Sequence, residues 1–404
     1  MEHRIKFGLI PEDQYTDYRY NVIFNAYKWD PQVEDHNTVA KQVLLIDKST
    51  ANQLEVLAEQ LSEETMQMEE AMIKNLPLAK ELGLPKDIRK SLSRLAGYNR
   101  ESNVRLMRFD FHPTTAGWAV SEVNSDVPGG IAEASVLPVI ASKYFEGYEP
   151  RKNIADILLN EFKKLIGNNG TVAFIHATSY ADDRQVMEFI GDYFKKNGFN
   201  SIMASPDHIV WKNKKAISII QGQEGEVDGI IRFFPLEWLA NLPKSCDWKG
   251  FYDCTTPSCN HPVAILTQPK RLPLVWDKLN VDVTTWKKLL PQTINPKSVD
   301  PDDESWIFKP SLGRVGEGIS IKEAVSEKEL RSIKKSVKRH PNNWIAQQKF
   351  ISQPIVTNDY QTYHVCIGVF TVNGKSAGFY GRISPFSRID GRAKDIPILV
   401  SKGD

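Results

Sequence analysis

The chain has 404 residues, a formal net charge of +1, 41% hydrophobic residues and 25% charged residues, which is ordinary globular composition. This length predicts two or three modules that share interfaces. The near-neutral charge gives no global electrostatic reason to bind nucleic acid or an anionic membrane, so we expect neither as a partner. The N-terminus lacks the apolar core of a signal peptide, and no apolar run approaches the roughly 18 residues needed to span a bilayer. We therefore expect a cytoplasmic protein.

The first hundred residues are predicted to be mostly helical. Apolar side chains recur at helical spacing within residues 50–76, which indicates a helix that buries one face. Thr50 and Gln53 fit a capping box at its start, and Pro77 is expected to end it. The positions of the buried stripe are Leu54, Leu57, Leu61, Met68 and Met72.

The stretch from 108 to 126, "RFDFHPTTAGWAVSEVNSD", contains two alternating runs joined by a segment with Pro113 and Gly117, which predicts a hairpin. Because side chains alternate along a strand, Arg108 and Asp110 point the same way on the first strand, and Glu122 and Asn124 share a face of the second, roughly 7 Å apart along it. We expect the two carboxylates, the amide and the arginine to converge. Hard cations such as Mg²⁺ prefer oxygen ligands, so Asp110, Glu122 and Asn124 form a candidate divalent-metal site. The alternative is a surface hairpin in which Arg108 forms a salt bridge with an acid.

Residues 171–233 predict a strand, a helix and a strand, as in a βαβ layer. Asp182 and Asp183 suit the start of the helix, and Lys195, Lys196 and Gly198 suit its end. The loop after the first strand contains no glycine, which excludes a dinucleotide fingerprint. We interpret this layer as a scaffold or a substrate platform.

Cysteines gather in one short stretch that ends at His261. The spacing of Cys246, Cys254 and Cys259 lacks the close pairs of zinc sites, so we expect an ordinary loop with reduced thiols, with a structural metal as the alternative.

From about residue 300 onward β-character dominates, in "SWIFKP", "GISI", "NWIAQQKFI" and the long run from Tyr363, with Asn373-Gly374 as a hairpin turn. The basic stretch "KKSVKR" is interpreted as the solvated face of a helix. In "WIFKPSLGRVGEGISI", Lys309 leads into a turn that contains Gly313, Gly316 and Gly318. Such a turn can cover phosphates with backbone N–H groups, and the lysine can reach them, although many glycine turns are only tight hairpins.

Two common nucleotide motifs are excluded. A P-loop requires a glycine where this chain has Val369, five residues before Gly374, and the HRD and DFG segments of protein kinases do not occur.

Taken in order, these segments resemble the glutathionylspermidine synthase family, whose synthetase part is a circularly permuted ATP-grasp ligase. Four blocks carry the resemblance, at 108–128, 308–321, 344–350 and 363–400. It implies a mixed α/β fold with an N-terminal helical segment and metal-binding hairpin (1–150), a Rossmann-like pre-ATP-grasp layer (151–275) and a nucleotide-binding part with a glycine-rich lid (276–404).

The resemblance also implies the site residues. Asp110, Glu122 and Asn124 would bind two Mg²⁺ ions, and Arg108, Arg382 and Lys309 would surround the transferred phosphate of ATP. Gly313, Gly316 and Gly318 would form the lid, and Gln347, Gln348, Lys349 and Phe350 would line the adenine slot. A second lysine on ATP stays open among Lys322, Lys334, Lys335 and Lys349.

The implied reaction joins a peptide-like acid to an amine or polyamine through an acyl phosphate, with release of ADP and phosphate. The chain has Gly129 and Gly130 where the family carries hydroxyl side chains, so the substrates stay open. The alternatives are a catalytically silent nucleotide-binding scaffold and a ligase that modifies a protein or peptide terminus.

Overall fold

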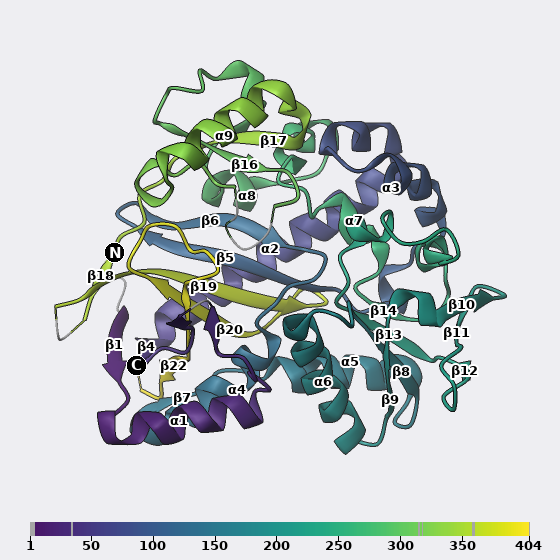
Figure 1. The fold of residues 1–404 in the computed structure, drawn as a ribbon, viewed down its shortest axis with the longest axis horizontal. Helices are drawn as coiled ribbons and strands as arrows, with labels where there is room; N and C mark the ends of the chain where they lie inside the picture. The colour runs from purple at the N-terminus through teal and green to yellow at the C-terminus, as the bar shows by residue number, and fades with distance from the viewer. Residues whose placement is uncertain (1–4, 34, 314–315, 317, 358–359, 404) are drawn as a thin grey trace.

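The computed structural model describes residues 5–33, 35–313, 316, 318–357 and 360–403. It confirms a mixed α/β protein, in which sheets of different size are packed with helices between and around them (Figure 1).

The largest sheet is antiparallel and joins distant parts of the sequence in the order β21-β20-β19-β5-β6, with β18 paired to β19. The predicted hairpin forms its β5 and β6, and the predicted turn at Asn373 and Gly374 joins β19 to β20 with φ values of 47° and 82°. The strands are β5 (Leu106–Thr114), β6 (Gly117–Asn124), β18 (Ile355–Val356), β19 (Thr362–Val372), β20 (Lys375–Ser384) and β21 (Lys394–Ile396).

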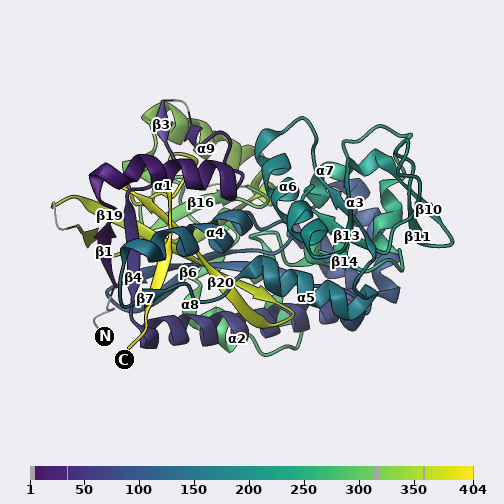
Figure 2. The same cartoon turned by 90° about the horizontal axis from the view of Figure 1, so that it is seen from below.

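Two helices cover opposite faces of this sheet (Figure 2). Helix α2 (Lys48–Lys74) packs with Phe109 and Phe111 in one core cluster, and α4 (Ile131–Ala141) packs with Ala377 in another. The predicted stripe of α2 is confirmed, since four of its positions are buried and Leu57 packs against the same cluster. The predicted cap at Thr50 is wrong, because Asp47 is the N-cap and its carboxylate accepts a hydrogen bond from the Thr50 backbone N–H at 2.7 Å.

A second sheet brings the two ends of the chain together in the order β1-β4-β22-β7. Helices α1 (Glu12–Asn25) and α4 pack near it. Its strands are β1 (Ile5–Leu9), β4 (Gln42–Ile46), β7 (Tyr148–Glu149) and β22 (Ile398–Ser401), and the first two lie in the part that was predicted to be mostly helical. Val43 and Leu45 share a hydrophobic core with residues of α1, while Leu44 and Ile46 share the core that contains α2. Strand β4 is therefore buried on both sides and shows no alternation of apolar and polar residues.

The middle of the chain forms a parallel sheet in the order β14-β13-β8-β9, as the βαβ pattern predicts. Strand β9 was not predicted; it directly follows α6 and is the strand that completes the βαβ unit. The elements are α5 (Ile154–Ile166), β8 (Thr171–Ile175), α6 (Ala181–Lys196), β9 (Asn200–Ala204), β13 (Gly229–Arg232) and β14 (Ser258–Cys259). A short antiparallel sheet of β10 (Ile209–Lys212), β11 (Lys215–Ser218) and β12 (Gly225–Glu226) adjoins it, and α7 (Leu236–Leu239) follows β13.

A small antiparallel sheet lies beyond β6, with the strand order β15-β17-β16 (Figure 1). Helix α9 covers its outer face through Ile333 and Val337, while the lysines of "KKSVKR" lie at the surface, as predicted. The elements are α8 (Thr284–Leu289), β15 (Thr293–Ile294), β16 (Trp306–Pro310), α9 (Glu327–Arg339) and β17 (Trp344–Gln348). The prediction of a strand at "GISI" is wrong, because no continuous ladder of described residues forms there. Instead, the Ser320 hydroxyl accepts a hydrogen bond from the Phe308 N–H at 2.7 Å, and the Ser320 N–H donates to the Phe308 carbonyl at 3.1 Å.

The remaining elements are short: β2 (Gln32–Val33), β3 (His36–Asn37) and α3 (Lys86–Ser91). Within the described ranges, no helix combines the length and the apolar character needed to cross a lipid bilayer. The four cysteines are free thiols.

Candidate functional site

A β-bulge places the predicted acids on the face of the large sheet opposite α2. Phe109 pairs with Val123 and Phe111 pairs with Val120, so Ser121 and Glu122 together oppose Asp110. The extra residue lets both valines face the core while polar side chains lie on the other face. The side-chain amide of Asn124, the last residue of β6, donates a hydrogen bond to Asp110 Oδ2 on β5 at 3.2 Å. The acid of β5 and the amide of β6 therefore lie side by side.

Arg108 is held by several groups at once. Its guanidinium donates to both carboxylate oxygens of Asp110, at 2.7 and 2.9 Å, and to the Gly129 carbonyl at 2.6 Å. It also lies over the ring of Tyr380, 5.0 Å from the centroid. The stem of Arg108 crosses Gly368, where a Cβ atom would come within 2.7 Å of it, so this central strand position leaves room for the arginine. Burial would lower the pKa of Arg108, but Asp110 outweighs burial and raises it.

Two lysines approach Glu122 from outside the large sheet. Lys270 Nζ lies 2.9 Å from Glu122 Oε2 and donates to the Gly313 carbonyl at 2.7 Å. Lys309 extends from β16 and donates to the Ser121 carbonyl at 3.2 Å, so it spans the space between the small and large sheets.

Burial and charge shift the pKa values of these groups in opposite ways. Burial would raise the pKa of the Glu122 carboxyl, but Lys270 and Lys309 hold it at about 2. Burial, with Lys270 nearby, lowers the pKa of the Lys309 ammonium to about 8, although Glu122 and Asp110 oppose this shift. The Lys309 ammonium therefore titrates just above neutral pH.

Lys270 was not predicted from the sequence. It follows Gln268, whose side-chain oxygen accepts hydrogen bonds from the backbone N–H groups of Ser125 and Asp126 at 2.8 and 2.7 Å. This contact fixes the lysine beside the end of β6. The segment "TQPKRLP" has no periodic pattern, so the buried side chain of Gln268 gave no signal in the sequence.

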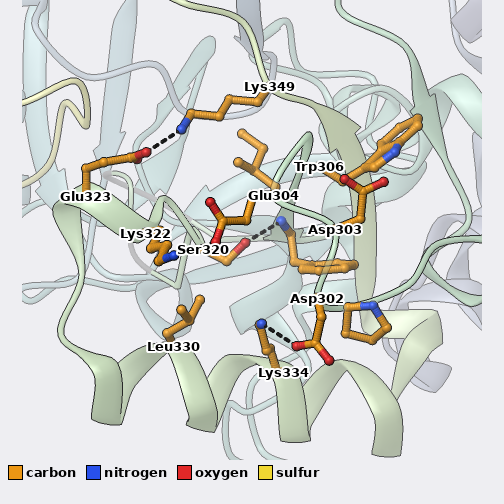
Figure 3. A pocket seen from close by; sticks show the side chains of 13 residues that line it. Asp302, Asp303, Glu304, Trp306, Ser320, Lys322, Glu323, Leu330, Lys334 and Lys349 are labelled. Carbon is orange, nitrogen blue, oxygen red and sulfur yellow. Dashed lines mark hydrogen bonds and ion pairs between the residues drawn. The ribbon is translucent and has the colours of Figure 1, made fainter.

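The lysines named as candidates for a second ATP contact lie elsewhere. Lys322, Lys334 and Lys349 form ion pairs with Glu304, Asp302 and Glu323 around a pocket on the outer side of the small sheet (Figure 3). Lys335 is exposed on α9. In the described part of the chain, Lys270 is the lysine that joins Lys309 at the acids.

Arg382 lies on the same sheet face as Asp110, two strands away. Its β20 position pairs with Cys366, and Tyr380, two residues before it, is in register with Gly368, which pairs with Asp110. Burial would lower the pKa of Arg382, but Tyr380 and Asp395 raise it. The cation thus stays charged on the face that carries Arg108.

The four predicted adenine residues, at the end of β17 and just after it, do not lie on one side. Gln347 is buried and shares a pocket with Glu122 and Lys270, and the ring of Phe350 lies 5.3 Å from that of His112. Gln348 is exposed, and Lys349 belongs to the outer pocket of Figure 3. The structure therefore brings Gln347 to Glu122 and Phe350 to His112, and it leaves Gln348 and Lys349 away from this site.

The glycine-rich segment is described only in part. Gly313 meets Lys270 through its carbonyl, and Gly316 and Gly318 have φ values of 69° and 68°, which favour glycine. The predicted lid also includes Arg314, Val315 and Glu317, which lie outside the described residues.

Asp110, Glu122 and Asn124 offer two carboxylates and an amide oxygen, the hard ligands that Mg²⁺ takes. Each carboxylate already pairs with a cation, Arg108 or Lys270. Within the described ranges no three His, Cys, Asp or Glu side chains gather as a metal site. The three side chains therefore fit a cation whose remaining ligands come from elsewhere, such as the oxygens of a phosphate.

In the cysteine-rich stretch, His261 Nδ1 accepts a hydrogen bond from the Val263 N–H at 3.2 Å, and Cys254 Sγ contacts backbone oxygens.

A model of the glutathionylspermidine synthase preATP-grasp family matches residues 13–397. The chain belongs to this family. As a family member it is 23% identical over 219 residues to a putative acid–amine ligase of Haemophilus influenzae, an alignment that covers 52% of this chain and 54% of that protein. The chain thus matches about half the length of this curated relative.

The family member also resembles a solved structure. A glutathione synthetase-like effector from Globodera pallida superposes with a TM-score of 0.63 at 11% identity, over 96% of both chains. This likeness concerns the fold alone.

Proposed function

We propose that the chain is an ATP-dependent ligase that joins a carboxylate to an amine through an acyl phosphate and releases ADP and phosphate. The observation that carries the proposal is the buried charge cluster between the two sheets. Arg108, Lys270 and Lys309 surround Asp110 and Glu122, which leaves a net positive site before Arg382 is counted. A site of this sign attracts a triphosphate.

The residues have separate tasks in this proposal. Phosphoryl transfer spreads negative charge over equatorial oxygens, so fixed cations on several sides stabilise it. Lys309 and Lys270 would hold the phosphates from the small-sheet side, and Arg108 and Arg382 from the large sheet. Bound Mg²⁺, held by Asp110, Glu122 and Asn124, would supply further positive charge to the phosphate oxygens.

We also propose that the fold is a permuted ATP-grasp fold. In a permuted ATP-grasp fold, the nucleotide lies between a large and a small sheet, and the E-x-N block precedes the lysine. The position of Lys309 on β16, with its ammonium at β6, supports this arrangement. The three segments 1–150, 151–275 and 276–404 remain our proposed division, with the nucleotide site shared between the first and third because β5 pairs with β19.

The acid substrate is proposed to be peptide-like, and the nucleophile an amine or polyamine. The name of the Haemophilus relative, an acid–amine ligase, supports this class. Among the described residues, an added Cβ at Gly129 would meet only Phe233, at 3.8 Å, whereas at Gly130 it would strike the Tyr380 ring at 2.8 Å. Gly130 is thus explained by packing, while the space at Gly129 favours, as second candidate, a ligase for a protein or peptide terminus.

The test is ATP turnover with pools of peptide acids and amines, scored for ADP and AMP. We expect substrate-dependent ADP, and its loss in Glu122→Gln but not in Glu323→Gln, an acid paired with Lys349 in the outer pocket. AMP would refute the acyl-phosphate mechanism. Absence of ADP across a broad pool would favour a nucleotide-binding scaffold.

A further inference from the structure

The loop between β20 and β21 contains an arginine that joins the large sheet to α9. Arg388 donates from Nε and Nη2 to Asp390 Oδ2 at 3.1 and 2.9 Å, and from Nη1 to Glu329 Oε1 at 3.3 Å. Glu329 lies in the first turn of α9. One guanidinium therefore binds an acid of its own loop and an acid of the element that covers the small sheet.

Asp390 connects this arginine to the candidate phosphate-binding arginine. The Asp390 backbone carbonyl accepts a hydrogen bond from Arg382 Nη2. Arg382 Nε is buried, and the described part of the chain offers it no hydrogen-bond acceptor. The direction of the Arg382 guanidinium thus depends on where the loop holds the Asp390 carbonyl.

The loop is fixed at Asp390 from two sides. Its carboxylate accepts from the Arg392 backbone N–H at 3.0 Å, and its carbonyl accepts from the Ala393 N–H at 3.0 Å, which forms the turn. Arg388 supplies the contact from the other side, with only 12% of its side chain and 14% of that of Asp390 exposed. Two charge-assisted hydrogen bonds to one carboxylate oxygen, shielded from water, orient the partner more firmly than an exposed ion pair does.

Arg392 offers a natural contrast within the same loop. It reaches Asp390 Oδ2 at 3.4 Å, but half of its side chain is exposed. Arg392 pairs with Asp390, whereas Arg388 also binds Glu329 of α9. If a positive charge near Asp390 were enough, both arginines would serve the same role. If the position of Asp390 matters, only Arg388 would.

We propose that Arg388 is a positioning residue that aims Arg382 at the transferred phosphate by clamping Asp390 between the β20–β21 loop and α9. This inference rests on the proposed ligase function, since it assigns the support of an arginine in that site. Arg388 itself contacts no substrate; it acts through the Asp390 carbonyl.

The first test is structural and needs no turnover. In crystals of Arg388→Ala we expect Arg382 to leave the Asp390 carbonyl, while in Arg392→Ala the contact stays. If Arg382 keeps its place in Arg388→Ala, the inference is overturned even if the ligase function holds. If the contact is lost but wild-type protein makes no ADP with any acid and amine, the ligase proposal fails alone.

The second test separates positioning from general loss of structure. We expect Arg388→Ala to lower kcat on the order of 10–100-fold with little change in the KM for ATP, because misplacing a catalytic group has costs of this order. Arg388→Lys, which keeps the charge but not the fork, should remain folded and recover only part of the rate. Arg392→Ala should match wild type.

The deciding comparison uses the Arg382→Ala background. If Arg388 acts through Arg382, Arg388→Ala should have almost no further effect on kcat there. An equal fold-loss in both backgrounds, or an unchanged kcat in Arg388→Ala alone, would overturn the inference.

Discussion

Replacing Lys270 by Met should reveal how strongly the site holds Glu122 as a carboxylate. The pKa of Glu122 falls from an ordinary value of 4.5 to about 2 although burial opposes the shift, and Lys270 is the largest favourable cause. A fall of this size is worth roughly 3 kcal/mol, at about 1.4 kcal/mol for each tenfold change in proton affinity. Lys309 stays near, so we expect a loss of about 2 kcal/mol in unfolding free energy at neutral pH.

The loss of stability in Lys270→Met should depend on pH. A depressed carboxyl pKa contributes stability that is complete above about pH 4.5 and is lost as the pH falls toward about 2. Urea unfolding of wild type and Lys270→Met, followed by tryptophan fluorescence from about pH 7 to about pH 3, should therefore show a difference that shrinks in acid.

The matched control is Lys349→Met. Its partner Glu323 is 60% exposed, so the change should stay within about 0.5 kcal/mol at every pH. A Lys270→Met loss that is the same at about pH 3 as at about pH 7 would mean that packing, and not the Glu122 charge, explains it. No loss at either pH would refute the reasoning altogether.

Three further outcomes are expected. Nucleotide affinity, measured by titration calorimetry, should weaken as the pH rises through about 8, because Lys309 loses its proton there, and Lys309→Arg should remove this inflection; an unchanged inflection would assign it to another group. Lys28→Met should lower unfolding free energy by about 3 kcal/mol, since it leaves two largely buried acids without their shared cation, and a stable variant would contradict this. Gly130→Ala should destabilise the fold in thermal denaturation through its φ of 88° and the Tyr380 ring, whereas Gly129→Ser should be tolerated; equal effects would refute the distinction.

The elements with strong periodicity could be predicted from the sequence. The stripe of α2, the β5–β6 hairpin and the Asn373-Gly374 turn follow from local pattern, because each has one buried face or a turn that demands positive φ. Strands β4 and β9 could not be found in this way. Strand β4 is buried on both faces, and it is held between β1 and β22, the latter at the far end of the chain.

The site shows the same division between local and long-range information. Alternation in β5 correctly grouped Arg108 with Asp110. The glycine-rich turn pointed to Lys309, and the family resemblance supplied Arg382. Lys270 was missed because only the contact of Gln268 with the end of β6, more than a hundred residues away, brings it to Glu122. Gln348 and Lys349 show the same limit. Gln348 faces away from Gln347 because side chains alternate along β17, whereas Lys349 comes just after the end of the strand and lines the outer pocket.

A crystal structure with Mg²⁺ and a non-hydrolysable ATP analogue tests the proposed nucleotide site most directly. We expect two magnesium ions held by Asp110, Glu122 and Asn124, with the terminal phosphate between Lys309 and Arg382. A nucleotide bound outside the space between the small and large sheets, or one whose phosphates avoid these acids, would contradict it.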